Sequence, residues 1–482
     1  MITWGISALT HDASISVIED DQILFAAHAE RYSKIKNDSG LNDKLIQSAL
    51  AFGKPNSVVW FENRWLKKWR QFRHLQWQYL FNLDRWPSRY MKKFGIKNDI
   101  VSVKHHLSHA ASGFLTSPFE EACIICIDSL GEDNTITVWK GEGTNIKLIK
   151  EINYPHSIGM LYSAFTKRCG LIPNEEEYIL MGMVPYGSPN YSVRIVRDFI
   201  QKSNFALSKN VHKGIGNWMP NARHEDLAAS IQCVLTWCLE EILQEHNGIS
   251  KNLVFMGGVA LNCVANRKLH KYFDNVWIMP NPGDSGSSLG CAAYHAQTRL
   301  KWNSPYLGTN IEKPYPVDEL YSELMKGNIV GVANGKAEFG PRALGNRSLF
   351  ADPRTLEMKD RVNEIKQRQK FRPFAPVILE EYAHEYFNLK ELNLTNSPYM
   401  QYTVRCKNPK AFPAIVHVDG TSRIQTVNRK QNPGLYDLLC RFHESTGCPM
   451  LLNTSLNIRG MPMVDDEQDG KLFEKKYNVK VF

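Results

Sequence analysis

Residues 2–30, ITWGISALTHDASISVIEDDQILFAAHAE, alternate apolar and polar side chains in three short runs separated by turn residues. Alternation with a period of two is typical of half-buried strands, so we predict an antiparallel meander. From Cys123 the pattern returns as CIICIDS, NTITVWK and IKLIKEI, and each copy has an aspartate near the end of its first strand, Asp12 and Asp128. A repeated unit of this kind predicts a duplicated α/β domain with its site between the two copies.

The composition is that of an ordinary globular protein. The chain has 482 residues, of which 43% are hydrophobic and 22% charged, enough for two to four domains. No stretch approaches about 18 uncharged apolar residues and no basic leader precedes an apolar run, so we expect no membrane partner, no secretory signal and a cytoplasmic location. The ten cysteines are scattered, and the pair Cys123 and Cys126 lies in a predicted buried strand, so we expect reduced thiols.

Residues 64–93 hold nearly all of the net charge. They contain nine Lys or Arg and one acid, Asp84, which gives +8 of the chain's formal +9, and Trp65, Trp69, Trp77, Tyr79 and Trp86 are interleaved. One interpretation is a nucleic-acid surface that meets phosphates and stacks on bases. The interpretation that we rank somewhat higher is an amphipathic helical hairpin, with the aromatics in the core and the basic residues in solvent.

Three histidines fall within residues 104–114, KHHLSHAASGF. His105 and His109 are four positions apart, so on a helix they share one face and form half of a metal site. The bland alternative, solvated or core histidines, is the commoner one for an isolated pair of this kind. A further ligand must come from elsewhere in the chain.

Further along, residues 224–246 have helical periodicity, and the strand NLVFMGG follows and ends in Gly257 and Gly258. We predict a helix starting at once in residues 259–273, so that free backbone N–H groups at the Gly-Gly turn could meet a phosphate or ribose. Asp284 precedes another predicted helix, where its structural alternative is an N-cap.

A Pro- and Gly-rich segment, residues 304–315, predicts a domain boundary. Beyond it, residues 342–372 contain nine Lys or Arg, and six of these, several beside Gly or Pro, cannot all lie on one solvated face. Arginine's fixed fork suits oxyanions, which predicts a phosphate or carboxylate pocket. The six are Arg342, Arg347, Arg354, Lys366, Arg368 and Arg372.

Eight motifs in this order complete a family pattern: HHLSHAAS, MGMVPYG, GGVALN, DSGSSLG, EFGPRALGNRS, FRPFAP, DGTSRIQTV and LLNTSLNIRG. From Gly5 to about Val464 the chain resembles the ATP-dependent O-carbamoyltransferases of nodulation-factor and antibiotic biosynthesis. The resemblance implies an actin/sugar-kinase-like duplicated domain, related to the threonylcarbamoyltransferases, over residues 1–310. A smaller α/β domain like the carbamoyl-adenylate synthases is implied for residues 311–482.

The implied reaction forms carbamoyl-adenylate from carbamoyl phosphate and ATP with magnesium, and then transfers the carbamoyl group to a hydroxyl of an acceptor. The family pattern implies an iron(II) site, or one for another divalent metal, at His105, His109 and Asp284, with Asp128 nearby. His11 and Lys36 match positions that touch the carbamoyl group or its phosphate. Asp226 is the candidate general base, with a helix N-cap as an equally good account.

The remaining implied residues bind the nucleotide or carbamoyl phosphate. Those of the first domain are Gly131, Gly257, Gly258 and Asn262, and those of the second are Arg342, Arg347, Lys366, Arg372, Asn453 and Ser455. Where the family usually has GEYK and GRMEFGPRALG, this chain has EEYI and GKAEFGPRALG, with Glu176, Ile179 and Lys336 at the changed positions. These departures bear on the acceptor and not on the metal or adenylate chemistry.

Several hypotheses stay open. The acceptor could be a small molecule, a sugar or a nucleotide, or a hydroxymethylated base in DNA or RNA bound through residues 64–93. A protein of another class, a non-catalytic nucleotide or nucleic-acid binder, is the alternative to an enzyme, and an ATP hydrolase or sugar kinase would leave the arginine-rich domain without a role. A homodimer is implied by the family alone.

Overall fold

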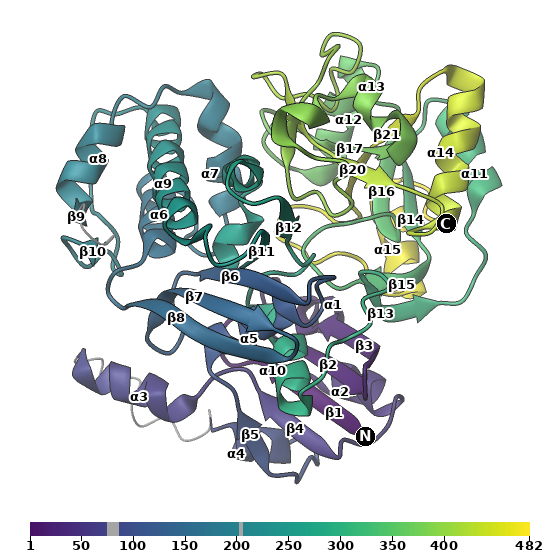
Figure 1. The fold of residues 1–482 in the computed structure, drawn as a ribbon. Coiled ribbons are helices and arrows are strands. Elements are labelled where there is room, and N and C mark those ends of the chain that lie inside the picture. The colour runs from purple at the N-terminus through teal and green to yellow at the C-terminus, as the bar shows by residue number, and fades with distance from the viewer. Residues whose placement is uncertain (75–85, 202–205) are drawn as a thin grey trace. The chain divides into compact units, whose positions relative to one another are not determined.

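The computed structural model describes residues 1–74, 86–201 and 206–482 (Figure 1). The chain divides into two compact units. The first unit comprises Met1–Ser33, Asn37–Ala265 and Tyr272–Asn303, and the second comprises Lys34–Lys36, Asn266–Lys271 and Ser304–Phe482. No helix among the described residues is both long and apolar enough to cross a membrane.

The first sheet of the first unit has the order β3-β2-β1-β4-β5. The first three strands form the predicted antiparallel meander, and β1–β4 and β4–β5 pair in parallel. The strands are β1 (Ile2–Ser7), β2 (Ser14–Glu19), β3 (Gln22–His28), β4 (Ser57–Trp60) and β5 (Ile100–Ser102). The helices between them are α1 (Ala29–Ser33), α2 (Asp43–Leu50), α3 (Arg64–Arg73) and α4 (Pro87–Lys92).

The second sheet repeats this topology strand for strand, in the order β8-β7-β6-β11-β12, with three antiparallel strands followed by two parallel ones. Its strands are β6 (Glu121–Ile127), β7 (Asn134–Glu142), β8 (Asn145–Asn153), β11 (Asn252–Met256) and β12 (Asn275–Trp277). The predicted duplication is therefore confirmed, and the unit is a duplicated α/β domain as expected.

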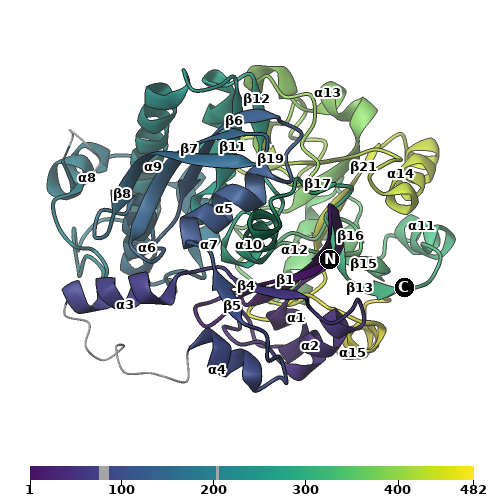
Figure 2. The same cartoon turned by 60° about the horizontal axis from the view of Figure 1, so that its bottom comes forward.

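Each copy ends in a helix that packs between the two sheets, α5 (His105–Phe114) and α10 (Ser287–Ala296) (Figures 1 and 2). Glycine at the contact points lets α10 approach both α5 and β1 closely. A Cβ on Gly290 would lie 1.9 Å from the Ser108 carbonyl oxygen, and one on Gly5 would lie 1.7 Å from that of Ser288. This packing brings the N-terminal ends of both helices to the junction of the copies.

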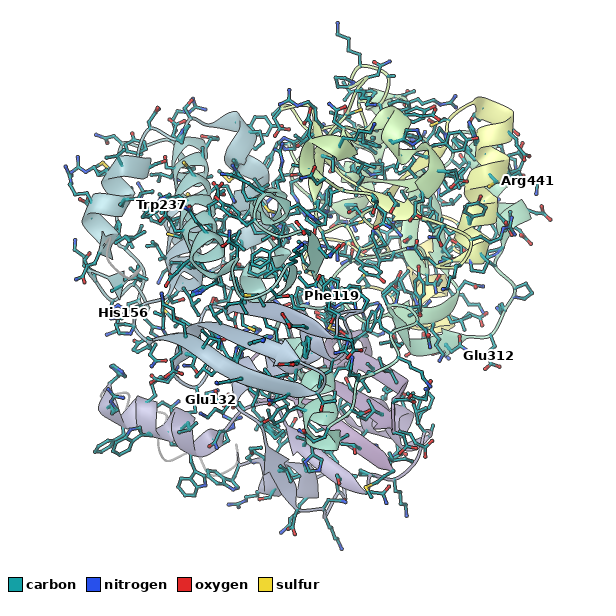
Figure 3. The ribbon with its side chains drawn as sticks, viewed as in Figure 1. Phe119, Glu132, His156, Trp237, Glu312 and Arg441 are labelled. Atoms are coloured by element: carbon teal, nitrogen blue, oxygen red, sulfur yellow. The ribbon has the colours of Figure 1, made fainter. Side chains whose placement is uncertain are left out.

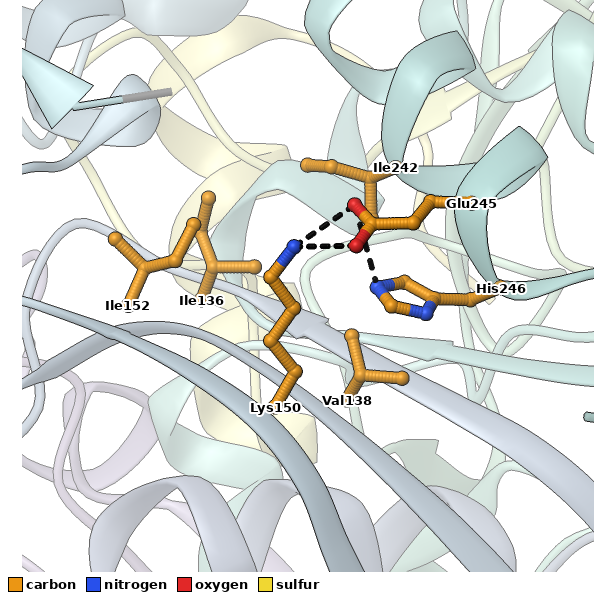
Figure 4. A pocket seen from close by; sticks show the side chains of 7 residues that line it. All are labelled: Ile136, Val138, Lys150, Ile152, Ile242, Glu245 and His246. Atoms are coloured by element: carbon orange, nitrogen blue, oxygen red, sulfur yellow. Dashed lines mark hydrogen bonds and ion pairs between the residues drawn. The ribbon is translucent and has the colours of Figure 1, made fainter. Parts of the chain in front are cut away.

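The second copy carries additional helices. These are α6 (Ile158–Arg168), α7 (Glu177–Met183), α8 (Ser192–Phe199) and α9 (His224–His246), with the short pair β9 (Ile200–Gln201) and β10 (Ala206–Leu207). Between α9 and strands β7 and β8 lies a void of about 10 Å³, lined by isoleucines and closed by the Lys150–Glu245 ion pair at 2.6 Å (Figure 4). It has room for about one water molecule and is a packing defect rather than a ligand site.

The helix predicted for residues 259–273 does not form. The chain makes two 3₁₀ turns instead, Gly258–Leu261 and Ala265–Lys271. At Asn262, between them, the backbone leaves the helical region, and the side-chain amide exchanges hydrogen bonds with that of Gln232 at 2.9 and 3.2 Å. A tertiary contact thus overrides the local helical pattern.

The second unit is built on a mixed five-stranded sheet in the order β14-β16-β21-β17-β20, in which only β17 and β20 pair in parallel. The strands are β14 (Val330–Ala333), β16 (Arg347–Ala351), β17 (Ala375–Leu379), β20 (Gln425–Val427) and β21 (Met450–Ser455). Its main helices are α11 (Val317–Met325), α12 (Leu356–Lys366), α14 (Pro433–Thr446) and α15 (Glu467–Tyr477).

Shorter elements complete the second unit. β13 (Tyr306–Ile311) pairs with β15 (Gly335–Glu338), β18 (Thr403–Arg405) pairs with β19 (Thr421–Arg423), and α13 (Ala383–Tyr386) follows β17. β13 occupies half of the segment that was predicted as a boundary, and the longest segment of the second unit begins at Ser304.

Candidate metal centre

The duplicated topology gathers four side chains from both copies. His105 and His109 come from the first turns of α5, Asp128 follows β6, and Asp284 opens the 3₁₀ turn Asp284–Gly286 that leads into α10. One donor atom of each lies within 4.8 Å of those of the other three. Both histidines are buried and face two carboxylates, so they are not solvated, and the candidate metal centre stays a prediction.

The distances between the donor atoms fit a single cation. His105 Nε2 lies 3.0 Å from His109 Nε2, 3.2 Å from Asp128 Oδ2 and 3.3 Å from Asp284 Oδ1. His109 Nε2 lies 3.3 Å from Asp284 Oδ1 and 3.5 Å from Asp128 Oδ2. Ligands at about 2.0–2.2 Å from a metal are separated from one another by roughly 3.0–3.6 Å, so these four atoms need little movement to bind one.

The electrostatics also call for a cation. All four residues are buried, with Asp128 and Asp284 at 8% and 6% exposure. Burial opposes ionisation, but the neighbouring imidazoles outweigh it and hold the pKa of both carboxyls well below the ordinary value. Burial likewise opposes charge on His105, but Asp284 and Asp128 raise its pKa above the ordinary value. Two buried carboxylates require positive charge, from protons on the imidazoles or from a metal.

Neighbouring groups fix the orientation of these ligands. Ser287 Oγ lies 3.2 Å from His109 Nδ1, and the Gly258 N–H donates to Asp128 Oδ1 at 3.2 Å. The backbone N–H of His105 donates to both carboxylate oxygens of Glu132, at 2.9 and 3.0 Å. Hydrogen bonds of this kind to metal-ligating residues fix the tautomer of a histidine and the orientation of the ligand side chain. Glu132, labelled in Figure 3, was missed by sequence reasoning because a lone acid in a loop gives no periodic signal.

The third histidine of the 104–114 stretch has a different role. His106 is fully buried, and its Nδ1 lies 3.0 Å from Thr137 Oγ1. Burial and the adjacent His105 and His109 lower the pKa of His106 to about 3, so this imidazole is neutral. It is a core residue and not a ligand.

His11 lies on the open side of the centre. Its side chain is 48% exposed, its Nε2 is 3.5 Å from Asp284 Oδ2, and its Nδ1 is 3.0 Å from Asp12 Oδ2. Burial opposes the charged imidazole, but Asp284 and Asp12 raise the pKa of His11 above the ordinary value. Lys36 falls in the Lys34–Lys36 segment that groups with the second unit.

The glycines of the predicted nucleotide loop lie against the candidate metal centre. Gly257 has φ +88°, and a Cβ there would lie 2.3 Å from the Ile127 carbonyl oxygen. A Cβ on Gly258 would lie 2.9 Å from Asp128 Oδ1, and one on Gly131 would lie 3.3 Å from His105 Cβ. All three glycines therefore allow loops to close around Asp128 and His105. The Asn262 amide, in contrast, is 8% exposed and used internally.

Asp226 is not a helix N-cap, so that alternative is wrong. Arg223 holds the N-cap position of α9, and Asp226 Oδ1 accepts a hydrogen bond from the Ser188 N–H at 2.9 Å. Gly187 makes this contact feasible, since a Cβ there would lie 2.0 Å from the Glu225 carbonyl oxygen. The carboxylate thus anchors the MGMVPYG loop, which ends at Gly187, to the start of α9.

In the second unit, Arg347 has a structural role. Its side chain is fully buried, and it donates to the carbonyl oxygens of Asn334 at 2.8 Å, Asp465 at 2.9 Å and Thr309 at 3.0 Å, among others. Its backbone N–H, with those of Leu344 and Asn346, donates to Glu338 Oε1. We therefore reassign Arg347 from phosphate binding to holding the loop that carries Arg342.

Other predicted residues of this unit do come together. Lys366 Nζ donates to the Ser455 carbonyl at 2.5 Å, to Ser455 Oγ at 3.0 Å and to Asn457 Oδ1 at 2.6 Å. Burial, with the nearby Arg368 and Arg372, lowers the pKa of Lys366 well below the ordinary value. Asn453, further back on β21, donates to Gln425 Oε1 at 2.7 Å. Arg342 and Arg372 are both partly exposed.

Comparisons with known proteins follow the same division of the chain. Residues 59–293 match the family model "Carbamoyltransferase N-terminus", and residues 321–481 match "Carbamoyltransferase C-terminus". An uncharacterized protein of Synechocystis sp. is 33% identical over 96% of this chain and 92% of its own length. Nodulation protein NolNO of Sinorhizobium fredii is 32% identical over 95% and 76%, and nodulation protein U of Bradyrhizobium diazoefficiens is 29% identical over 95% and 92%.

Solved structures are more distant. Component A of (R)-2-hydroxyglutaryl-CoA dehydratase from Acidaminococcus fermentans covers 62% of this chain and 99% of its own, with 17% identity and a TM-score of 0.37. HypF from T. kodakarensis covers 61% and 47%, with 12% identity and a TM-score of 0.36.

Proposed function

Because this chain belongs to the carbamoyltransferase family, we propose that it is an ATP-dependent O-carbamoyltransferase that works through carbamoyl-adenylate. Carbamoyl phosphate, ATP and water give carbamoyl-adenylate, phosphate and pyrophosphate. The acceptor hydroxyl oxygen then attacks the carbamoyl carbon, the bond from that carbon to the AMP oxygen breaks, and AMP leaves. The hydroxyl proton passes to a base.

The observation that carries the proposal is the buried cluster of His105, His109, Asp128 and Asp284. Its mixed imidazole and carboxylate ligands suit iron(II) or a similar divalent ion. A cation held there would polarise a carbonyl or phosphoryl oxygen and offset negative charge on the leaving group. The glycine loops at 257–258 and 131 let the chain close around the ligands without steric conflict.

The chain's own residues supply binding and proton transfer. His11, on the open side of the centre, donates from a ring N–H to a carbamoyl or phosphate oxygen, and Lys36 assists. Asp226 is the proposed base: its Oδ1 is fixed by the Ser188 N–H, and its Oδ2 accepts the hydroxyl proton. Asn262 contributes by holding the loop after the two glycines.

The second unit is the proposed site of adenylate formation. Arg342 and Arg372 pair with the phosphates of carbamoyl phosphate and of ATP, which enters with magnesium. Lys366, Asn453 and Ser455 line the same pocket. The basis for this placement is the clustering of Lys366, Arg372 and Ser455, together with the match to the carbamoyltransferase C-terminus.

Pyrophosphate release tests the first half-reaction. Anaerobically purified, iron(II)-loaded protein is given ATP with and without carbamoyl phosphate, beside Arg342→Ala and the matched control Arg429→Ala, whose guanidinium is 65% exposed and pairs with Asp437. We expect release that needs carbamoyl phosphate, is lost in Arg342→Ala and is kept in the control. A wild type that binds ATP and releases no pyrophosphate would refute the proposal.

The acceptor of this proposal is a hydroxyl on a small molecule, a sugar or a nucleotide. A second candidate is a hydroxymethylated base within a polynucleotide. The specific observation in its favour is the exposed aromatic face of α3, where Trp65 and Trp69 are 72% and 60% exposed.

A further inference from the structure

Helix α3 lies on the first unit with its charged side inward. Arg64 Nε is 2.8 Å and Lys67 Nζ is 2.9 Å from the carboxylate of Glu62, which is 1% exposed. Arg70 is 6% exposed and donates to the Gly131 carbonyl at 3.2 Å. The interpretation that the aromatic residues of this segment are core and its basic residues solvated is therefore wrong for α3. Residues 75–85, with Trp77, Tyr79, Asp84 and Arg85, lie outside the described residues.

The outward side of α3 is aromatic. Trp65, Trp69 and Phe72, at one-turn spacing, are 72%, 60% and 48% exposed, and Leu66 between them is 37% exposed. The rings of Trp69 and Phe72 are stacked, with centroids 5.9 Å apart and planes at 22°, and Trp65 meets Trp86 edge-on at 4.9 Å. We call these four outward residues of α3, Trp65, Leu66, Trp69 and Phe72, the aromatic face.

Positively charged residues adjoin the aromatic face along the chain. Residues 64–74 and 86–93 contain eight Lys or Arg and no acid. Three of the eight point inward as described above, and the other five are Lys68, Arg73, Arg89, Lys92 and Lys93. Of these, Arg73, Arg89, Lys92 and Lys93 are exposed.

We propose that the aromatic face binds a single-stranded polynucleotide. Every base has a π-face that can stack on Trp or Phe, and the phosphates between bases match the surrounding cations. A second copy of this chain would bring like charges together. An anionic membrane surface would also attract the basic residues. However, three of the four residues of the aromatic face are aromatic and their rings already pair with other rings, which favours stacking of bases on them over their insertion into a bilayer.

A hollow continues the surface at the start of α3. Its volume is about 660 Å³, and Asn63, the N-cap residue of α3, lines it together with Ser102, Lys104, Trp139, Tyr294 and His295. Among the residues that the structure describes, none that lines it carries a carboxylate. A strand that leaves the aromatic face in this direction therefore meets neutral or basic groups only.

The same helix is fastened to the metal centre. Glu132 accepts the backbone N–H groups of both Asn63 and His105, and Arg70 binds the carbonyl of the preceding Gly131. Two neighbouring residues thus hold α3 and the start of α5 in register. If the proposed function holds, on which this last step rests, the bound strand carries the acceptor hydroxyl.

Fluorescence anisotropy of a labelled dT₂₀ strand, titrated with the full chain at increasing KCl, tests the binding. We expect saturable binding that weakens steeply with salt. Trp65→Ala/Trp69→Ala should weaken it at least about tenfold, and Trp65→Phe/Trp69→Phe should restore most of the affinity, because Phe also stacks. Arg73→Gln should lower the slope of log K against log salt by about 0.7. The control Val193→Ala, at a residue 84% exposed on α8, should change nothing.

Equal affinity of the wild type and the double Ala variant would overturn the proposal, as would absence of binding at 50 mM KCl. Flotation with phosphatidylglycerol vesicles that is lost in the same variant, without strand binding, would overturn it in favour of a membrane surface. The assay contains no ATP or carbamoyl phosphate, so its failure is distinguishable from failure of pyrophosphate release.

Discussion

Replacing Glu132 by alanine should weaken both the fold and the metal centre. Glu132 is 2% exposed and accepts the His105 N–H at 2.9 and 3.0 Å and the Asn63 N–H at 2.5 Å. A hydrogen bond to a charged group contributes about 1.5–3 kcal/mol, so two N–H groups lose roughly 3–6 kcal/mol. Burial raises the pKa of Glu132, which shows that its ionised form also bears a cost, and we expect the lower end, about 3 kcal/mol.

At about 2 °C per kcal/mol for a large unit, the melting temperature should fall by roughly 6 °C. Because His105 is the first residue of α5, its ring also loses its fixed position, and metal affinity should fall about tenfold or more. Circular dichroism melts and anaerobic iron(II) titration measure the two effects. The control is Glu142→Ala, at a side chain 72% exposed at the end of β7. A variant with unchanged melting temperature and metal affinity would refute the reasoning.

Three further perturbations have defined outcomes. Gly257→Ala should destabilise the protein by more than about 2 kcal/mol in urea unfolding, since φ is +88° and the new Cβ meets a carbonyl 2.3 Å away; Gly248→Ala, in open space, should not. Arg347→Lys should lower the melting temperature, because a single ammonium cannot serve carbonyls on separate strands, at a cost of about 3 kcal/mol. Hydrogen bonds from Lys480, Lys326 and Asn328 lower the pKa of Glu323 to about 2. The carboxylate therefore contributes stability above pH 4.5, and this contribution is lost as the pH falls toward 2. Thermal melts of Glu323→Gln at different pH values should lack this acid-dependent loss of stability.

Each of these has a contrary result. Equal urea midpoints for the two glycine variants would show that the loop relaxes around the new methyl group. An unchanged melting temperature in Arg347→Lys would return Arg347 to the candidates for phosphate binding. Parallel pH curves for wild type and Glu323→Gln would show that this carboxylate is ionised as easily in the unfolded chain.

The duplicated sheet could be predicted from the sequence for a physical reason, whereas the four residues of the candidate metal centre could not all be predicted in that way. Apolar and polar side chains alternate in residues 2–30 and again after Cys123. This pattern reflects the burial of one face of each strand and can be recognised without knowing the tertiary structure. Asp128 and Asp284 were identified through the family resemblance, because nothing local distinguishes a carboxylate that meets two imidazoles from a helix cap. Only the pairing of strands and helices brings them together.

The errors arose where a distant partner decides the outcome. The helix predicted after Gly258 is interrupted because Asn262 binds Gln232, thirty residues earlier. The basic side of α3 faces inward, opposite to the prediction, because Lys67 pairs with Glu62 and Arg70 donates to the Gly131 carbonyl. Arg347 was taken for a ligand-binding residue, but its side-chain N–H groups donate to backbone carbonyls of distant segments such as Thr309 and Asp465. In each case the local sequence pattern was read correctly, but it does not identify the residue that the side chain contacts in the fold.

Trapping the intermediate tests the central claim most directly. Wild type and the double variant His105→Ala/His109→Ala are incubated with ¹⁴C-labelled carbamoyl phosphate and ATP, and the nucleotides are separated by chromatography. We expect labelled carbamoyl-adenylate from both proteins, because the proposed adenylate-forming residues lie in the second unit, with its onward transfer to added hydroxyl compounds lost in the variant. A wild type that binds both substrates and yields no labelled adenylate would contradict the account.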